Sequence, residues 1–348
     1  MRVLNTTLIL VFTLAGNLSV AANSPDEKSI QKILQDFVAA SKPNRSVGSK
    51  GHKAAFEFLK KEFDHLAAEH SGSVYEHSFT PEIEFAVSNY KKDFETLVEG
   101  KISKDKPDYK KWKDFTDYSI SFVQKYKGKA GRNLVLEFKG KKLPNEVVYV
   151  GAHFDTITHD HASMRFTPDS PTDGADDNAS GIAALLYTAK KLAEEKHDRT
   201  VRIVAFDYEE VFFLGSYALA KDLKEGQLDW APKAERYRGL FNLEMIGWSK
   251  ASLQSRPTVK LYTRPDTDEG SKDDLVLAQL FDASVKSLKA KLKPQILKNG
   301  FNRSDNWSFW QKGFSAVCIS QDWEGDFNEK NYHTDHDNIE NLNLPYLT

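Results

Sequence analysis

The sequence predicts an α/β sandwich, in which helices flank a central and largely parallel sheet. Two observations lead to this fold class. From Arg132 onward, short apolar runs typical of buried strands alternate with amphipathic stretches typical of helices. Acidic residues and histidines stand where several of these apolar runs end. Because ligands of such sheets bind beyond the carboxyl ends of the strands, these positions mark the expected functional site.

The composition fits a folded chain and excludes several classes of protein. The 348 residues are 40% hydrophobic and 28% charged, which is too apolar for a disordered protein. With 48 basic and 50 acidic residues the formal charge is -2, so no nucleic-acid partner is expected. The single cysteine, Cys318, excludes an intramolecular disulfide and a cysteine-based zinc finger.

Residues 1–22 have the pattern of a secretory signal peptide. Arg2 supplies a positive charge, residues 8–15 form a short apolar core, and residues 19–22 are small enough for cleavage. A membrane anchor is the alternative, but the apolar stretch is short and Asn17 interrupts it. We therefore expect a secreted or periplasmic protein with no stable membrane anchor after cleavage.

The remaining residues, 23–348, are expected to form a single domain with an insertion. Residues 26–70 show helical periodicity in two runs, separated by a loop at residues 43–49. The insertion, at about residues 82–131, is rich in lysine and aromatic residues. It could be a basic-aromatic binding face, but its charges nearly cancel, which favours a solvated helical excursion with aromatic side chains turned inward. Such an excursion could act as a lid that restricts substrate length.

The elements after Arg132 follow from hydrophobic periodicity. Residues 147–152 are a continuous apolar run, as in a fully buried strand, and residues 201–206, rich in valine and interrupted only by Arg202, are expected to form the next strand. Residues 180–196 place Ile182, Leu185 and other apolar side chains on one helical face. The expected strands are residues 134–138, 147–152, 201–206, 239–245 and 315–319, and the other expected helices are residues 215–223 and 275–292.

The acidic residues and histidines at the strand ends suit a site for two divalent metal ions. His153 and Asp155 are two positions apart at a strand end, so both side chains can approach the same site. Imidazole nitrogen and carboxylate oxygen are ligands that zinc prefers, and a carboxylate can bridge two ions. The adjacent Glu209 and Glu210 offer one metal ligand and one free carboxylate, which could serve as a general base.

These motifs resemble the secreted di-zinc aminopeptidases of metallopeptidase family 28, which have the zinc exopeptidase fold. The matching segments are His153-Phe154-Asp155, Asp177-Asn178-Ala179-Ser180-Gly181, Glu209-Glu210 with the later Gly215-Ser216, Glu244, and His333-Thr334. The resemblance covers about residues 132–348, and Arg45-Ser46-Val47-Gly48-Ser49 is similar to the family's N-terminal start. It implies a three-layer α/β sandwich around a mixed, mostly parallel sheet, of the phosphorylase/hydrolase-like type.

The resemblance also implies a set of ligands for two zinc ions (Zn²⁺). His153, Asp177 and Glu244 would hold one ion, and Asp177, Glu210 and His333 would hold the other. Asp177 would bridge the two ions. The resemblance selects Asp177 over the adjacent Asp176, which spacing alone does not decide.

The same resemblance assigns the remaining roles and the reaction. Glu209 would be the general base and Asp155 the partner of His153, with a supporting role for Asp305. The implied enzyme is a metallo-exopeptidase, a hydrolase that uses metal-activated water to cleave the first bond of peptides with a free N-terminus. Two alternatives remain: a glutaminyl cyclase-like zinc acyltransferase and a non-catalytic binding protein on the same fold.

Three features depart from the family pattern. Phe212 and Phe213 replace the Gly-Leu expected after the glutamate pair, and Glu244 stands where many members have aspartate. The long segment 156–174 includes His159-Asp160-His161, which could bind an extra metal but is expected to be a solvated loop tip.

Overall fold

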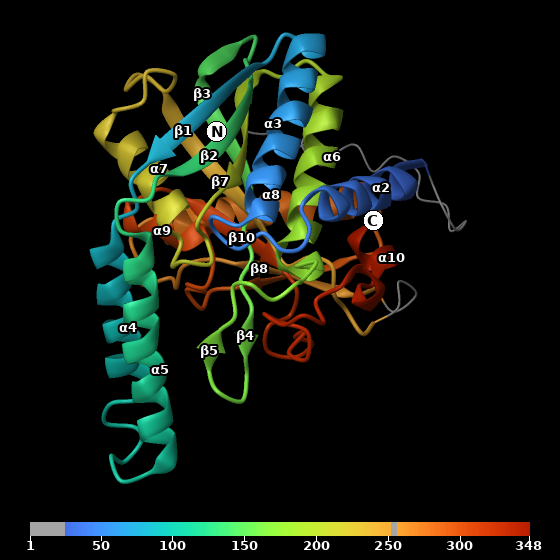
Figure 1. Ribbon diagram of the computed structural model, residues 1–348. Coiled ribbons are helices and arrows are strands. Elements are labelled where there is room, and N and C mark those ends of the chain that lie inside the picture. The colour runs from blue at the N-terminus through green and yellow to red at the C-terminus, as the bar shows by residue number, and fades with distance from the viewer. Residues whose placement is uncertain (1–24, 252–255) are drawn as a thin grey trace.

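The computed structural model describes residues 25–251 and 256–348 (Figure 1). The predicted signal peptide lies outside these residues. At the centre is an eight-stranded sheet in the order β1-β2-β6-β3-β7-β10-β8-β9. The strands are β1 (Ser73–Phe79), β2 (Gly131–Phe138), β3 (Leu143–His153), β6 (Arg199–Phe206), β7 (Arg236–Glu244), β8 (Thr258–Tyr262), β9 (Lys293–Leu297) and β10 (Ala316–Ser320).

The sheet is mixed but mostly parallel, as predicted. The four adjacent strands β6, β3, β7 and β10 are parallel to one another, and β8 is parallel to β9. The pairs β1–β2, β2–β6 and β10–β8 are antiparallel. The carboxyl ends of β3, β6, β7 and β10 therefore meet at one edge, where an α/β sheet binds its ligands.

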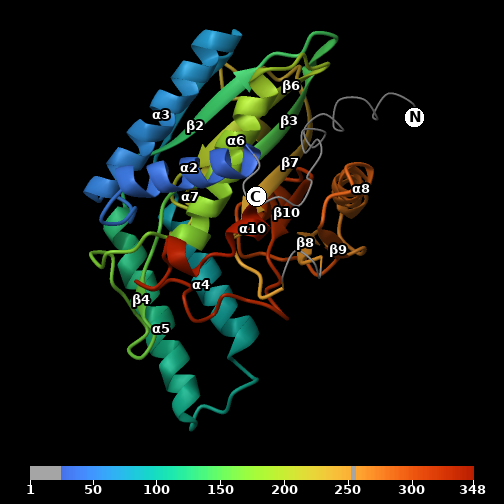
Figure 2. The same cartoon turned by 90° about the vertical axis from the view of Figure 1, so that its right-hand side faces the viewer.

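Helices cover both faces of the sheet, which gives three layers (Figures 1 and 2). On one face α3 (Lys50–His70), α6 (Gly181–Ala193) and α8 (Ser271–Ser287) share a hydrophobic core with Leu134 and Leu136 of β2. On the other face α7 (Leu214–Glu225) and α9 (Asn306–Gln311) share a core with Val135. Because successive strand residues point to opposite faces, a strand covered on both sides reads as a continuous apolar run.

The predicted insertion forms a helical hairpin between β1 and β2. It consists of α4 (Ile83–Leu97) and α5 (Pro107–Val123), and ends in the short helix η1 (Gln124–Tyr126). Figures 1 and 2 show the hairpin as an arm that projects from the body of the molecule. The root of the arm joins the body through a small core that includes Phe122 and Tyr126 of the hairpin and Tyr208 and Leu214 of the body.

Several elements differ from the predictions. The helix expected over residues 275–292 ends at Ser287, because Lys289 adopts a left-handed backbone with φ of 53° and β9 begins four residues later. Strands β1, β8 and β9 were not predicted, since their sequences mix polar and apolar residues. The remaining elements are α2 (Pro25–Ala40), the short ribbon β4 (His159–Asp160) and β5 (Arg165–Phe166), the irregular helical segment η2 (Ala175–Ser180), η4 (Ile339–Asn341) and α10 (Leu344–Leu347). Among the described residues, no helix has the length and apolar character needed to span a membrane.

Candidate metal centre

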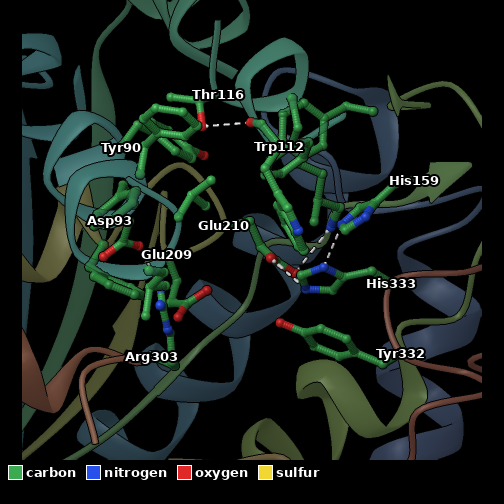
Figure 3. A pocket seen from close by; sticks show the side chains of 18 residues that line it. Tyr90, Asp93, Trp112, Thr116, His159, Glu209, Glu210, Arg303, Tyr332 and His333 are labelled. Carbon is green, nitrogen blue, oxygen red and sulfur yellow. Dashed lines mark hydrogen bonds and ion pairs between the residues drawn. The ribbon is translucent and has the colours of Figure 1, made fainter. Parts of the chain in front are cut away.

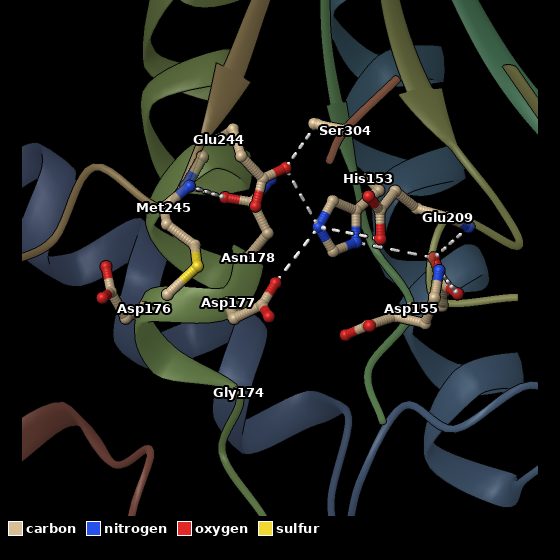
Figure 4. Close-up of polar contacts among 12 residues, drawn as sticks. His153, Asp155, Gly174, Asp176, Asp177, Asn178, Glu209, Glu244, Met245 and Ser304 are labelled. Carbon is tan, nitrogen blue, oxygen red and sulfur yellow. Dashed lines mark hydrogen bonds and ion pairs between the residues drawn. The ribbon is translucent and has the colours of Figure 1, made fainter. Parts of the chain in front are cut away.

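The predicted site residues converge at the carboxyl edge of the sheet, and Figure 4 shows those around His153. His153 is the last residue of β3 and Glu244 the last residue of β7, and Glu209 and Glu210 follow β6. Asp177 lies in η2, and His333 lies in the segment between β10 and α10. The parallel register of the central strands explains why side chains so far apart in the sequence meet here.

Two clusters of possible metal ligands share the carboxylate of Asp177. His153 Nε2 lies 3.2 Å from Asp177 Oδ1 and 3.4 Å from Glu244 Oε2. His333 Nε2 lies 3.1 Å from Asp177 Oδ2 and 3.1 Å from Glu210 Oε2. In each cluster of three residues the ligand atoms lie within 4.8 Å of one another. The two oxygens of Asp177 thus face different clusters, the arrangement required of a bridging ligand.

The chemistry of the clusters fits zinc. His153 is fully buried, yet neither of its ring nitrogens forms a good hydrogen bond within the described residues. Burial raises the pKa of Glu210 to about 7, and the nearby Asp177 adds to this effect. Burial likewise raises the pKa of Glu244. A divalent cation would relieve this crowding of buried carboxylates, and the mixed nitrogen and oxygen donors are those that zinc prefers.

Asp177, and not Asp176, faces both clusters. The amide groups of Asp176 and Asp177 donate to the two oxygens of Asp337, at 2.8 and 2.9 Å. The side chain of Asp176 points away from the clusters and accepts hydrogen bonds from Asn328 and from the amide of Gly247, each at 2.9 Å. The choice between the two aspartates, which spacing left open, therefore has a visible cause in the fold of η2.

Asp155 connects His153 with the backbone of the glutamate pair. Its Oδ1 accepts a hydrogen bond from the amide of Glu209, and its Oδ2 accepts one from the amide of Glu210, both at 3.1 Å. The same Oδ1 lies 3.6 Å from His153 Nδ1. Sequence reasoning had paired Asp155 with His153 alone, and the two backbone contacts add a second positioning function.

Glu209 lies beside both clusters, and its carboxylate forms a third group of possible ligand atoms with His153 and Glu210. Its Oε2 lies 3.8 Å from His153 Nε2, and the side chain is buried. Burial raises the pKa of Glu209 well above its ordinary value, and the nearby Glu244 and Glu210 raise it further. A carboxylate with a raised pKa is suited to accepting and returning a proton near neutral pH.

Asp305 lies close to the centre, next to a residue that sequence reasoning missed. Its carboxylate is fully buried without a well-formed hydrogen bond within the described residues, and burial raises its pKa to about 8. The adjacent Ser304 donates a hydrogen bond of 2.6 Å to Glu244 Oε2 and accepts one of 2.7 Å from Asn242. Ser304 thereby orients Glu244, a contact for which the sequence offered no signal beyond its position before Asp305.

The segment 156–174 is folded over the second cluster, so the expectation of a solvated loop tip is wrong for His159. His159 Nε2 lies 2.6 Å from His333 Nδ1, and Phe166 of β5 packs against the His159 ring with a centroid distance of 5.4 Å. Burial lowers the pKa of His159 to about 2, to which His333 also contributes, so its ring is neutral. Asp160 and His161 are exposed, as expected of the tip.

The glutamate pair and His333 border a cavity of about 480 Å³ between the metal centre and the helical hairpin (Figure 3). The hairpin contributes mainly apolar side chains, which are Tyr90, Phe94, Leu97, Val98, Trp112 and Phe115. Phe212 and Phe213, which replace the Gly-Leu of the family pattern, also line the cavity. The Phe212 ring contacts that of Tyr90 at 4.8 Å, so this departure joins the body to the hairpin.

An ion pair crosses the rim of the same cavity. Arg303 Nη1 on the body lies 2.7 Å from Asp93 Oδ2 on α4, and both residues line the cavity. The pair is partly exposed, so its contribution to stability is small, on the order of 1 kcal/mol or less. The pair adds charged groups to a cavity wall that is otherwise largely apolar on the side of the hairpin.

Known proteins share both the sequence pattern and the fold. Residues 133–348 match the model of Peptidase family M28. The aminopeptidase YwaD of Bacillus subtilis is 30% identical over 230 residues, which are 65% of this chain and 43% of YwaD. The chain thus spans less than half of that relative's length.

Two solved structures show the same fold at low sequence identity. BSAP, a zinc aminopeptidase from Bacillus subtilis, superimposes with a TM-score of 0.59 at 20% identity, covering 92% of this chain and 91% of that one. A glutaminyl cyclase from Bacteroides thetaiotaomicron superimposes with a TM-score of 0.58 at 16% identity, covering 94% and 95%. The match of the family model covers well over half of the residues, and the chain belongs to Peptidase family M28.

Proposed function

We propose that this chain is a secreted or periplasmic zinc aminopeptidase, which hydrolyses the first bond of peptides with a free N-terminus. The observation that carries this proposal is the pair of clusters that share Asp177, with the carboxylate of Glu209 beside them at the wall of a cavity. Membership of a peptidase family and the similarity to YwaD support it. The proposed export rests on the signal-like pattern of residues 1–22.

We assign the two clusters to two zinc ions. His153, Asp177 and Glu244 would hold one, and Asp177, Glu210 and His333 the other. Zinc bound there would act as a Lewis acid, polarising the scissile carbonyl and lowering the pKa of water. The first cluster is buried, and Glu210 and His333 of the second are partly buried, so solvent is largely excluded and electrostatic interactions are strengthened.

Glu209 is the proposed general base and proton shuttle. It would take a proton from the attacking water and return it to the leaving amine, because its carboxylate stands next to both clusters without a tight ion pair of its own. Asp155 would keep Glu209 in place through the backbone and fix the orientation of His153. Ser304 would orient Glu244 through its hydrogen bond, and the supporting role proposed for the adjacent Asp305 rests on the family resemblance.

The cavity suggests which peptides are accepted. Its aromatic wall would favour a large apolar side chain near the N-terminus of the substrate, since burial of such a side chain contributes about 1.5–3 kcal/mol. The hairpin stands over the cavity and would limit peptide length, as a lid does.

The first experiment is to incubate the zinc-loaded protein with a mixture of peptides, some beginning with glutamine, and to follow their masses. Stepwise loss of N-terminal residues that a chelator abolishes is the expected result. Loss of ammonia from the glutamine-led peptides alone would instead identify a cyclase. No change in any peptide, with zinc bound, would favour a non-catalytic binding protein.

A substitution of Glu209 tests the assigned mechanism. Glu209→Gln removes the proton acceptor but keeps the size of the side chain and all five proposed ligands. We expect it to retain zinc while turnover falls by roughly 10²–10⁴-fold, the usual contribution of a general base. Turnover within tenfold of the wild type would remove Glu209 from this role.

The lid is tested by shortening the hairpin without disturbing its root. Residues 90–117 would be replaced by a short glycine-serine turn, so that Phe122 and Tyr126 still pack against the body. The folded variant should cleave longer peptides than the wild type. An unchanged dependence on peptide length would refute the lid.

A further inference from the structure

A second histidine stands directly behind the proposed zinc ligand His333. His159 Nε2 lies 2.6 Å from His333 Nδ1, the ring nitrogen opposite the one that faces Asp177 and Glu210 (Figure 3). The two ring centroids are 4.6 Å apart and the ring planes are inclined by 59°. This is the place where a metal-binding imidazole usually donates its remaining N–H to a carboxylate, a backbone carbonyl or water.

The direction of this hydrogen bond follows from the chemistry of a ligand. If His333 binds zinc through Nε2, that nitrogen must be free of its proton, and the proton of the neutral ring resides on Nδ1. His159 Nε2 must then accept the bond, which puts the proton of His159 on its own Nδ1. One hydrogen bond thereby fixes the tautomer of both rings and the orientation of the ligand.

The backbone around the two histidines is also connected. The amide of His159 donates to the carbonyl of His333 at 2.8 Å. Thr172, at the other end of the same segment, donates from its hydroxyl to the carbonyl of Thr334 at 3.0 Å. His333 itself has a left-handed backbone with φ of 55°, a conformation that a non-glycine residue keeps only when surrounding contacts hold it. The segment 156–174 supplies such contacts.

We propose that His159 is a positioning residue for the second zinc ion: its Nε2 accepts a hydrogen bond from His333 Nδ1 and so holds His333 in its ligand orientation. The inference rests on the proposed function, since it assigns His333 as a zinc ligand. It predicts how many zinc ions remain bound when the contact is lost. The first cluster, His153 with Asp177 and Glu244, does not contact His159, so loss of the contact should weaken one ion and leave the other in place.

Two substitutions of similar size separate the hydrogen bond from simple packing. His159→Gln keeps a carbonyl oxygen that can accept from His333, and His159→Met fills the same space against Phe166 without a good acceptor. His161→Ala is the matched control, because His161 lies in the same segment, is exposed, and contacts the His159 ring at a centroid distance of 5.7 Å and the backbone carbonyl of Tyr332 at 3.2 Å but no proposed ligand side chain.

The measurement is the zinc content of each protein after dialysis against buffers of set free zinc concentration, with circular dichroism to show that each is folded. We expect His159→Met to bind its second zinc about 10–100-fold more weakly than the wild type, the usual effect of losing such a partner. His159→Gln and His161→Ala should bind two zinc ions at nearly wild-type concentrations.

The other results each decide a different question. A folded His159→Met variant that binds two zinc ions as tightly as the wild type would overturn the role of His159, as would an equal loss in His161→Ala. Should the methionine variant not fold, loss of the second ion from a folded His159→Gln variant would overturn it as well. A wild type that binds no zinc would instead overturn the proposed function.

Discussion

Arg45 is predicted to connect two segments of the metal centre, the one around Phe154 and the one that leads into η2. Its side chain is 1% exposed. Its guanidinium donates to the carbonyl of Phe154 at 2.7 Å, to that of Gly174 at 2.9 Å, and to that of Asp173. Phe154 separates the proposed ligand His153 from Asp155, and Gly174 immediately precedes η2. We therefore expect Arg45→Met to destabilise the fold and to loosen the site.

The size of the effect follows from these contacts. Each hydrogen bond from a charged donor contributes about 1.5–3 kcal/mol, so the three bonds together stabilise the fold by roughly 5–9 kcal/mol. Burial opposes this, because it lowers the pKa of Arg45 to about 10 despite the nearby aspartates. A shift of that size corresponds to about 3 kcal/mol. The expected net loss in Arg45→Met is about 4 kcal/mol of the free energy of unfolding.

Urea unfolding of the zinc-free protein measures this loss without contributions from metal binding. Arg45→Lys is the control, because its ammonium keeps the charge but cannot reach three carbonyls in a fixed geometry. It should recover part of the loss. A loss below about 1 kcal/mol in Arg45→Met would show that the three bonds merely replace bonds to water and would refute the reasoning.

Three further predictions concern other buried polar groups. Burial lowers the pKa of His52, but the neighbouring Asp207 outweighs burial, so the pKa is raised overall. The ion pair therefore stabilises the folded protein fully below the ordinary pKa of 6.5. This stabilisation is lost as the pH rises through the pKa of His52 in the folded state. The difference in unfolding free energy between wild type and His52→Gln should therefore shrink toward alkaline pH in urea titrations. Arg202→Met removes a fully buried guanidinium from its ion pairs with Glu137 and Glu235. It should cost about 3–5 kcal/mol in the same assay, while turnover of the remaining folded protein stays unchanged. Asp177→Asn should reduce the bound zinc at both clusters and Glu244→Gln at only one, as measured by metal analysis; equal losses in the two variants would contradict a shared ligand.

The strands that could be predicted are those covered by helices on both faces, because their burial requires mostly apolar residues. Strands β3 and β6 have helices on both faces, so they are mainly apolar apart from residues such as Arg202, and their ends are visible where His153 and Asp207 begin a polar stretch. Strand β9, at the edge of the sheet, carries Lys293 and Gln295 and is only partly buried. Its sequence shows neither alternation nor an apolar run, so no strand was predicted there, and the predicted helix extended up to residue 292, directly before it.

His153, Glu210 and Glu244 could be found because they stand at or just after these predictable ends. Asp177 and His333 lie in other segments and were assigned through the family resemblance, and several contacts that support the ligands could not be predicted. His159 and His333 are brought together by hydrogen bonds between distant segments, and the two-residue pairing of β4 and β5 that includes His159 is too short for local periodicity to reveal. The sequence indicated Arg45 only as part of a loop that is similar to the N-terminal start of the family. Its contacts depend on where Phe154 and Gly174 lie in space. Supporting contacts between distant backbone segments leave no pattern in a single sequence.

The order of the proposed ligands along the chain has a consequence for synthesis. His153, Asp177 and Glu244 are all translated well before His333, which belongs to a segment that follows the last strand of the sheet. A chain made as far as Glu244 therefore contains every residue of the first cluster but lacks His333 of the second. Completion of the second cluster would require the segment containing His333 to dock beside His159.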